Sequence, residues 1–164
     1  MQINSFKEMY ISELQEARSL EAQLTSSLSN MIEKTAHADL KQALQEHLSE
    51  TQNHMERVGE ILQRHGATEK DHKDQSMVRL VSEAEKWAEM IKDRGQRDAG
   101  IIASAQRIEH YEMAVYGTLA AWAKRLRFVE DEEDLRAILA QERAADEKLT
   151  RLAEREVNPS AASV

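Results

Sequence analysis

Five glutamates have the residue type and the spacing expected of metal ligands. They fall near the middle of four predicted helices: Glu21, Glu50, Glu109, Glu112 and Glu142. A carboxylate buried without a partner costs several kcal/mol, and no Lys or Arg lies on the same helical stripes. Divalent cations are the simplest counter-charge, because carboxylate oxygens and imidazole nitrogens bind iron, manganese and zinc. Bridging glutamates would hold two such ions roughly 3.5–4 Å apart.

Two further donors follow glutamates at a spacing of four residues, which keeps both residues on one helix face. His54 follows Glu50, and Asp146 follows Glu142. His54 is either a ligand or a hydrogen-bond partner of a carboxylate. Asp146 is either a ligand or a residue that holds a neighbouring side chain. His47, one turn before Glu50, is expected as a buried polar residue behind the ligands.

The segment IEHYEMAVYGTL, residues 108–119, carries two of the glutamates on a stripe that is otherwise mostly apolar. One interpretation places Glu109 and Glu112 on a solvated edge of a helix bundle, because most glutamates are exposed. The matching height of the other three glutamates favours a metal cluster instead. Tyr116, one turn after Glu112, is expected as a core tyrosine, with a hydrogen-bonding role as the alternative.

The elements that must position these residues are helices. The chain of 164 residues contains one proline and five glycines, and Ala, Glu, Leu, Gln, Arg and Lys dominate it, as is typical of an all-helical protein. Apolar residues recur at helical spacing in four long segments and one short one, which span residues 5–34, 39–65, 77–92, 97–127 and 133–155.

The connections predict how these helices are arranged. The links at residues 35–39 and 129–134 (VEDEED) are short, so each pair of long helices forms an antiparallel hairpin. Between the hairpins, a polar loop at 67–76 and the short helix can run back along the bundle. We therefore expect an all-α, antiparallel four-helix bundle with one long crossover that contains a short fifth helix. It forms one domain, residues 1–157, followed by a disordered tail, residues 158–164.

The composition and the N-terminal sequence indicate which classes of binding partner and which cellular compartment to expect. The formal net charge of −8 repels nucleic acid and anionic membranes, and no apolar run approaches the length of about 18 residues that a membrane helix needs. The N-terminal MQINSFKEMY lacks the features of a signal peptide. The absence of cysteine excludes thiolate ligands. We expect a cytoplasmic protein with no nucleic-acid or membrane partner.

Four segments of the chain resemble the YciE/YciF family of bacterial, stress-associated, ferritin-like proteins. They are SLEAQL (19–24), QEHLSET (45–51), RDAGIIASAQRIEHYEMAVYGTL (97–119) and LAQERAADEKLTRLA (139–153). The resemblance covers nearly the whole chain. It implies a fold similar to that of rubrerythrin and ferritin, a dinuclear metal site and a homodimer, without naming a reaction.

The resemblance also implies ligands, residue by residue. Ferritin-like diiron proteins carry Glu on the first long helix, Glu-x-x-His on the second and fourth, and in rubrerythrins Glu-x-x-Glu on the third. The matching residues are Glu21, Glu50, Glu109, Glu112 and Glu142. The resemblance implies Glu21 and Glu142 as terminal ligands, and Glu50 with either Glu109 or Glu112 as bridges. The histidines depart from the pattern, because Asn53 and Ala145 stand in their places. His54 and Asp146 are the expected replacements.

The resulting hypothesis is a dinuclear metal-binding protein of a bacterial stress response. Iron is the expected metal, with manganese or zinc as alternatives, and oxidation of Fe(II) or reduction of peroxide is the expected chemistry if the protein is an enzyme. The alternative is a metal-free, dimeric structural or interaction module with a vestigial site.

Overall fold

The computed structural model describes residues 3–68 and 73–163, which are helical apart from short connections and contain no strand. The all-α prediction is confirmed. The described helices, in chain order, are α1 (Phe6–Lys34), α2 (Ala38–Arg64), α3 (Gln75–Met90), α4 (Arg94–Leu126), α5 (Val129–Leu152), a π-helical turn (Ala153–Val157) and α6 (Asn158–Ala161). Among these residues, no helix is long and apolar enough to cross a membrane.

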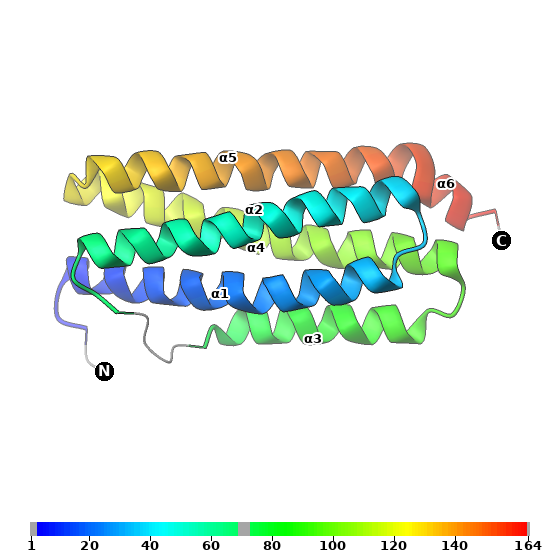
Figure 1. Ribbon diagram of the computed structural model, residues 1–164, viewed down its shortest axis with the longest axis horizontal. Helices are drawn as coiled ribbons and strands as arrows, with labels where there is room; N and C mark the ends of the chain where they lie inside the picture. Colours follow the sequence, from blue (N-terminus) through cyan, green and yellow to red (C-terminus); the bar gives the residue numbers. More distant parts are fainter. Residues whose placement is uncertain (1–2, 69–72, 164) are drawn as a thin grey trace.

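Four long helices run side by side along the molecule (Figure 1). Helix α1 packs against α2 and α4, and α5 packs against the same two helices. Each helix is antiparallel to the two that it contacts, so α1 and α5 lie on one diagonal of the bundle and α2 and α4 on the other. Helix α3 lies outside this square, against α1 and α4, and returns the chain to the end where α4 begins (Figure 1). The predicted bundle with one long crossover is therefore confirmed.

One buried carboxylate joins the start of the crossover helix to the bundle. Asp74 Oδ1 accepts a hydrogen bond from the Met77 backbone N–H at 2.9 Å and so caps α3. Its Oδ2 accepts from the Tyr111 hydroxyl of α4 at 2.7 Å, and its backbone N–H donates to Ser19 Oγ of α1 at 3.0 Å. The expected loop at residues 67–76 includes 69–72, which lie outside the described residues.

Two predicted boundaries near the C-terminal hairpin differ from the structure. The acidic segment 129–134 is the start of α5 rather than a link, since acidic side chains are favoured in the first turn of a helix. Asp131 is also buried, and it accepts hydrogen bonds from Arg64 Nε and the Tyr10 hydroxyl, both at 2.9 Å. Helix α4 begins at Arg94, three residues earlier than expected, because Asp93 Oδ1 caps it by accepting from the Gln96 N–H at 2.8 Å.

The expected disordered tail also differs from the structure in the described residues 158–163. The chain continues from the π-helical turn into α6, which contacts α4. Val157 is 2 % exposed, so its burial fixes the path of the chain into α6. Pro159 lies at the start of this short helix, where a missing N–H is tolerated. Val164 lies outside the described residues.

The predicted inward stripes coincide with the core. In α1 the apolar residues of the stripe are all buried, and Glu21 occupies the next position of the same stripe with no exposed surface. In α2 the buried stripe contains two histidines, His47 and His54, two turns apart. In α4 it contains Glu109 and Glu112. The bundle therefore has a polar layer inside an otherwise apolar core.

Candidate metal centre

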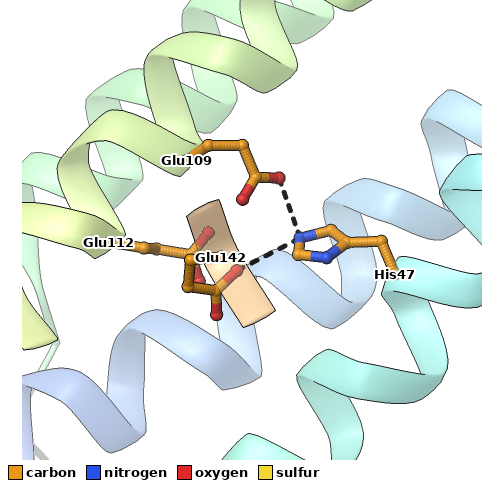
Figure 2. Close-up of side chains that lie close together, drawn as sticks. All are labelled: His47, Glu109, Glu112 and Glu142. Carbon is orange, nitrogen blue, oxygen red and sulfur yellow. Dashed lines mark ion pairs between the residues drawn. The ribbon is translucent and has the colours of Figure 1, made fainter. Parts of the chain in front are cut away.

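Four carboxylates from three helices meet inside the bundle. Glu21 of α1, Glu109 and Glu112 of α4, and Glu142 of α5 are each at most 1 % exposed. Helix α2 supplies the opposing side with two imidazoles. Figure 2 shows His47 directed toward Glu109 and Glu142, with Glu112 beside them. Four of the five glutamates that the sequence places near the middles of helices thus come together in the fold.

The donor atoms form two overlapping groups. In the first, His47 Nε2 lies 2.9 Å from Glu109 Oε1 and 4.0 Å from Glu142 Oε2, and a Glu112 oxygen completes a set in which all atoms lie within 4.8 Å of one another. In the second, His54 Nδ1 lies 2.8 Å from Glu142 Oε1 and 3.8 Å from Glu21 Oε1, within the same limit. Glu142 belongs to both groups, so it lies between two places where an ion can bind.

Most polar atoms of the cluster have no hydrogen-bond partner. Among the described residues, both oxygens of Glu112 and of Glu142 are buried without a hydrogen-bond partner, as is one oxygen each of Glu21 and Glu109. Glu142 makes ion-pair contacts with the two imidazoles. Leaving a buried polar atom unpaired costs about 1–3 kcal/mol, and more for a charged group. In the described part of the chain, no Lys or Arg forms an ion pair with these four carboxylates. Unpaired oxygens that converge with imidazole nitrogens are the donor set that divalent metals fit.

Proton binding is the alternative way to neutralise this layer. Burial and the neighbouring charge of Glu142 raise the pKa of Glu21 to about 8. Burial likewise raises the pKa of Glu109 to about 7, and burial with the charges of Glu142 and Glu21 raises that of Glu112 well above its usual range. Burial therefore favours the protonated form of Glu21, Glu109 and Glu112.

The two histidines respond to their surroundings in the same direction. Burial disfavours a charged His47, but the contacts with Glu109 and Glu50 outweigh it and raise the His47 pKa well above its usual value. For His54, burial is likewise outweighed by Glu142 and Glu21, so its pKa is also raised. Each imidazole can therefore carry a positive charge that a bound metal ion would replace.

Residues around the cluster hold the donors in place. Gln141 Oε1 accepts a hydrogen bond from His54 Nε2 at 2.9 Å. Because this amide oxygen only accepts, Nε2 carries the proton, and Nδ1 is the nitrogen directed into the cluster. The buried Tyr116 hydroxyl donates a hydrogen bond to Glu21 Oε1, and the other Glu21 oxygen has no hydrogen-bond partner in the described residues. Partners of this kind are typical of metal sites, where they orient the ligands.

Comparison with known proteins shows which family the chain belongs to. Residues 5–162 match the family described as a domain of unknown function (DUF892). YciF of Escherichia coli K12 is 36 % identical over 162 residues, which cover 98 % of each chain. The chain belongs to this family. The resemblance to the YciE/YciF family that the sequence indicates is thereby confirmed.

Solved structures of relatives agree with the fold. The crystal structure of the E. coli stress protein YciF has a TM-score of 0.91 at 36 % identity and covers 95 % of this chain and 99 % of its own. YcfI from Rhodopseudomonas palustris has a TM-score of 0.88 at 36 % identity, over 91 % of this chain and 95 % of its own. A Xanthomonas campestris protein, 22 % identical over 92 % of each chain with a TM-score of 0.73, shares the fold.

In this YciF-family chain, the structure brings five of the seven predicted ligands together: Glu21, His54, Glu109, Glu112 and Glu142. Their ligand roles stay predictions. Glu50 lies instead at the rim, with a side chain that is 40 % exposed and an oxygen 3.7 Å from His47 Nδ1. The contact with His47 lowers the pKa of Glu50, so this carboxylate is charged. Helix rotation explains its position, because the core residue of this turn is Thr51, about 100° further round.

Asp146 is the second predicted ligand that lies outside the cluster. Its carboxylate accepts a hydrogen bond from Gln106 Nε2 at 3.2 Å and lies 3.3 Å from His110 Nε2. It therefore joins α5 to α4, which is the alternative role that the sequence left open. Four residues exceed one helical turn by about 40°, and this rotation places Asp146 against α4 rather than inside the cluster.

His47 is the donor that sequence reasoning underestimated. It was expected behind the ligands, yet its Nε2 points into the cluster (Figure 2). A signal was present, since His47 and His54 are seven residues apart and therefore share a face of α2. This chain lacks the histidines of the Glu-x-x-His pattern, and His47 and His54 of α2 are the imidazoles that reach the layer instead.

Proposed function

We propose that this protein binds two divalent metal ions, iron foremost, in the buried layer, and acts in a bacterial stress response. The observation that carries the proposal is the set of oxygens without a hydrogen-bond partner on Glu112 and Glu142, between two imidazoles, in the described part of the chain. The second part is supported by E. coli YciF, a relative described as a stress protein. The cytoplasm and a homodimer belong to the same proposal, and light scattering of the purified chain tests the dimer.

The geometry suggests which residues hold each ion. Glu21 and His54 would bind one, and His47 and Glu109 the other. Glu142 is common to both groups, so it is the expected bridge, in place of the terminal role that the resemblance implied. Glu112 belongs to the His47 group. Oxygen donors with one imidazole per ion suit iron and manganese, and also zinc.

A bound pair of Fe(II) ions would supply the two electrons that, with two protons, reduce hydrogen peroxide to water, and the iron would itself be oxidised to Fe(III). The chain's own part is to orient the donors. Tyr116 holds one oxygen of Glu21, and Gln141 fixes the face of His54. Apolar core residues pack around the buried cluster, so charges within it interact more strongly than they would at the surface.

Thermal melting with and without metal tests the binding. A ligand that binds only the folded state at 100 times its Kd stabilises it by about 2.7 kcal/mol. We expect Fe(II), added anaerobically to chelator-treated protein, to raise the melting temperature by several degrees. The variant Glu142→Gln should lose this shift. Glu147→Gln, which removes an exposed charge from the same helix, is the matched control and should keep it.

A second candidate is a metal-free structural module. Two observations favour it: the Rhodopseudomonas relative is described as a candidate structural protein, and the raised pKa values of Glu21 and Glu109 allow protons to neutralise the layer. This candidate predicts a melting temperature that neither Fe(II) nor a chelator changes.

A further inference from the structure

A cavity between α2 and α5 extends from the surface to the buried cluster. Its volume is about 110 Å³, which accommodates several water molecules at roughly 10–15 Å³ each. A hydrated metal ion fits this space, whereas organic ligands occupy pockets of roughly 300 Å³ or more. The small side chains Ala144 and Ala145 leave it open on the α5 side.

The inner end of the cavity is made by two cluster residues. His47 and Glu109 line it, and both are at least nine-tenths buried. Each has side-chain atoms without a hydrogen-bond partner, including Glu109 Oε2. An ion that enters the cavity therefore meets unpaired donors at its inner end, and no rearrangement of the helix backbone is needed to reach them.

Charged residues line the outer part of the same cavity. Glu46 of α2 and Lys148 of α5 form a close ion pair across it, with side chains 50 % and 41 % exposed. Glu50 lies one turn further along α2, 40 % exposed, and contacts His47 Nδ1 at 3.7 Å. Glu50 is thus in contact with solvent and with the cluster at once.

We propose that this cavity is the route by which hydrated divalent cations reach the cluster, and that Glu50 is the carboxylate that receives them. The inference rests on the proposed metal-binding function. The four cluster carboxylates are buried, so a cation arriving from solvent needs a partly exposed partner first. Lys148 opposes the approach of a cation in two ways. Its positive charge repels the cation, and its ion pair with Glu46 neutralises that carboxylate.

A second depression between the same helices is the rival route. It lies on the other side of Gln141, has a volume of about 350 Å³ and reaches His54. The guanidinium of Arg57 lines it and pairs with Glu60 at 3.0 Å and with Asp134 at 3.6 Å. The hydrogen bond from His54 to Gln141 closes its inner end. Each route carries one cation, Lys148 or Arg57, and the closed inner end makes this depression the poorer path.

The rate of Co²⁺ uptake by metal-free protein tests the route, since the visible absorption of Co²⁺ reports its binding. Glu50→Gln removes the charge but keeps an oxygen beside His47. At low ionic strength we expect this variant to take up Co²⁺ roughly tenfold more slowly than the wild type, because charges that line a cleft raise association rates by about 10-fold or more. Lys148→Met should take it up faster, and salt should reduce both differences.

The final Co²⁺ content shows whether Glu50 only speeds the entry of the ion or is itself a ligand of the bound ion. Glu50→Gln should reach the same number of ions per chain as the wild type, only later. Glu56→Gln removes the same charge from the same helix at the rival depression and should leave the rate unchanged.

The outcomes that overturn the route differ from those that overturn the function. A wild-type rate in Glu50→Gln, a slower rate in Glu56→Gln, or a lower final content in Glu50→Gln overturns the route alone. A wild-type protein that takes up no Co²⁺ overturns the proposed function and the route together.

Discussion

His54 Nδ1 lies 2.8 Å from Glu142 Oε1, with both side chains buried at the centre of the bundle. The contact joins α2 to α5. The atoms are close, but among the described residues His54 Nδ1 has no hydrogen-bond partner with suitable geometry. On its far side the same imidazole is fixed by Gln141. In the proposed metal site, His54 would be a ligand and Gln141 the partner that orients it; without metal, His54 and Glu142 form a buried ion pair.

Gln141 is expected to matter for metal affinity and not for folding. Gln141→Leu removes the acceptor for His54 Nε2, so the imidazole loses its fixed orientation. Loss of such a partner typically lowers metal affinity about 10- to 100-fold, which competition with a chelator measures. Gln141→Glu keeps an acceptor oxygen and should restore most of the affinity. An equal loss in both variants would contradict this role. Melting of the metal-free variants should change little, because Gln141 is exposed.

Stability of the metal-free protein is expected to fall as pH rises from about 5 to 8. The folded pKa of Glu21 is about 8 and that of Glu109 about 7, against a usual 4.5. A group with a raised folded pKa stabilises the folded state below its unfolded pKa and loses that effect as pH rises through the folded pKa. The raised pKa values of His47 and His54 act in the same direction.

Chemical denaturation at several pH values measures this dependence. One proton released per chain changes the free energy of unfolding by about 1.4 kcal/mol per pH unit. Metal-loaded protein should lack the decline, because the ions replace the protons. A metal-free protein whose stability is constant or increases between pH 5 and 8 would show that the layer does not take up protons on folding.

Glu112 is expected to destabilise the metal-free fold. Both of its oxygens are buried without a hydrogen-bond partner. Glu112→Met replaces the carboxyl group with an apolar side chain of similar volume, and should stabilise the fold by about 1–3 kcal/mol, the usual cost of a buried polar group without a partner. Thermal melting in chelator should therefore show a higher transition temperature, while Fe(II) should shift it less than in the wild type. A lower transition temperature in chelator would mean that Glu112 has a structural role.

Asp131 provides the opposite case, a buried carboxylate that stabilises without binding metal. It accepts hydrogen bonds from Tyr10 and Arg64 at 2.9 Å and lies 2.6 Å from His65 Nε2. Asp131→Ala should destabilise the fold by about 1–3 kcal/mol, since it removes the acceptor of the buried Tyr10 hydroxyl. Arg64, in contrast, keeps its contacts with Glu130 and Asp134. The metal content of the folded fraction should stay at the wild-type value, and a proportional loss of metal would contradict the separation of the two sites.

The sequence was sufficient to predict the layer of carboxylates because a helical stripe has few positions. Once Tyr10, Leu14 and Ala17 define the inward stripe of α1, position 21 is next, and the glutamate there must be buried. The same reasoning places Glu109, Glu112 and Glu142. Antiparallel packing of helices of similar length then brings the middles of the helices to one level.

Side-chain direction was less predictable, since a spacing in sequence leaves a helix free to rotate by tens of degrees. Glu50 and Thr51 are both near the inward face of α2, and the structure buries Thr51 and leaves Glu50 at the rim. The choice depends on how α2 and α5 pack, which no pattern within α2 contains. The segment 129–134 is predicted as a link but begins α5, for a related reason. The residue that Asp131 contacts is Arg64, 67 residues away in sequence.

Metal content per chain, measured by elemental analysis after anaerobic loading with Fe(II) and removal of excess metal, tests the central claim most directly. The account predicts about two ions per chain in the wild type, because Glu142 lies between two donor groups. It predicts fewer than about 0.5 ions in Glu142→Gln, since a bridge serves both ions. A wild type that retains no iron, or a Glu142→Gln variant that keeps both ions, would contradict it.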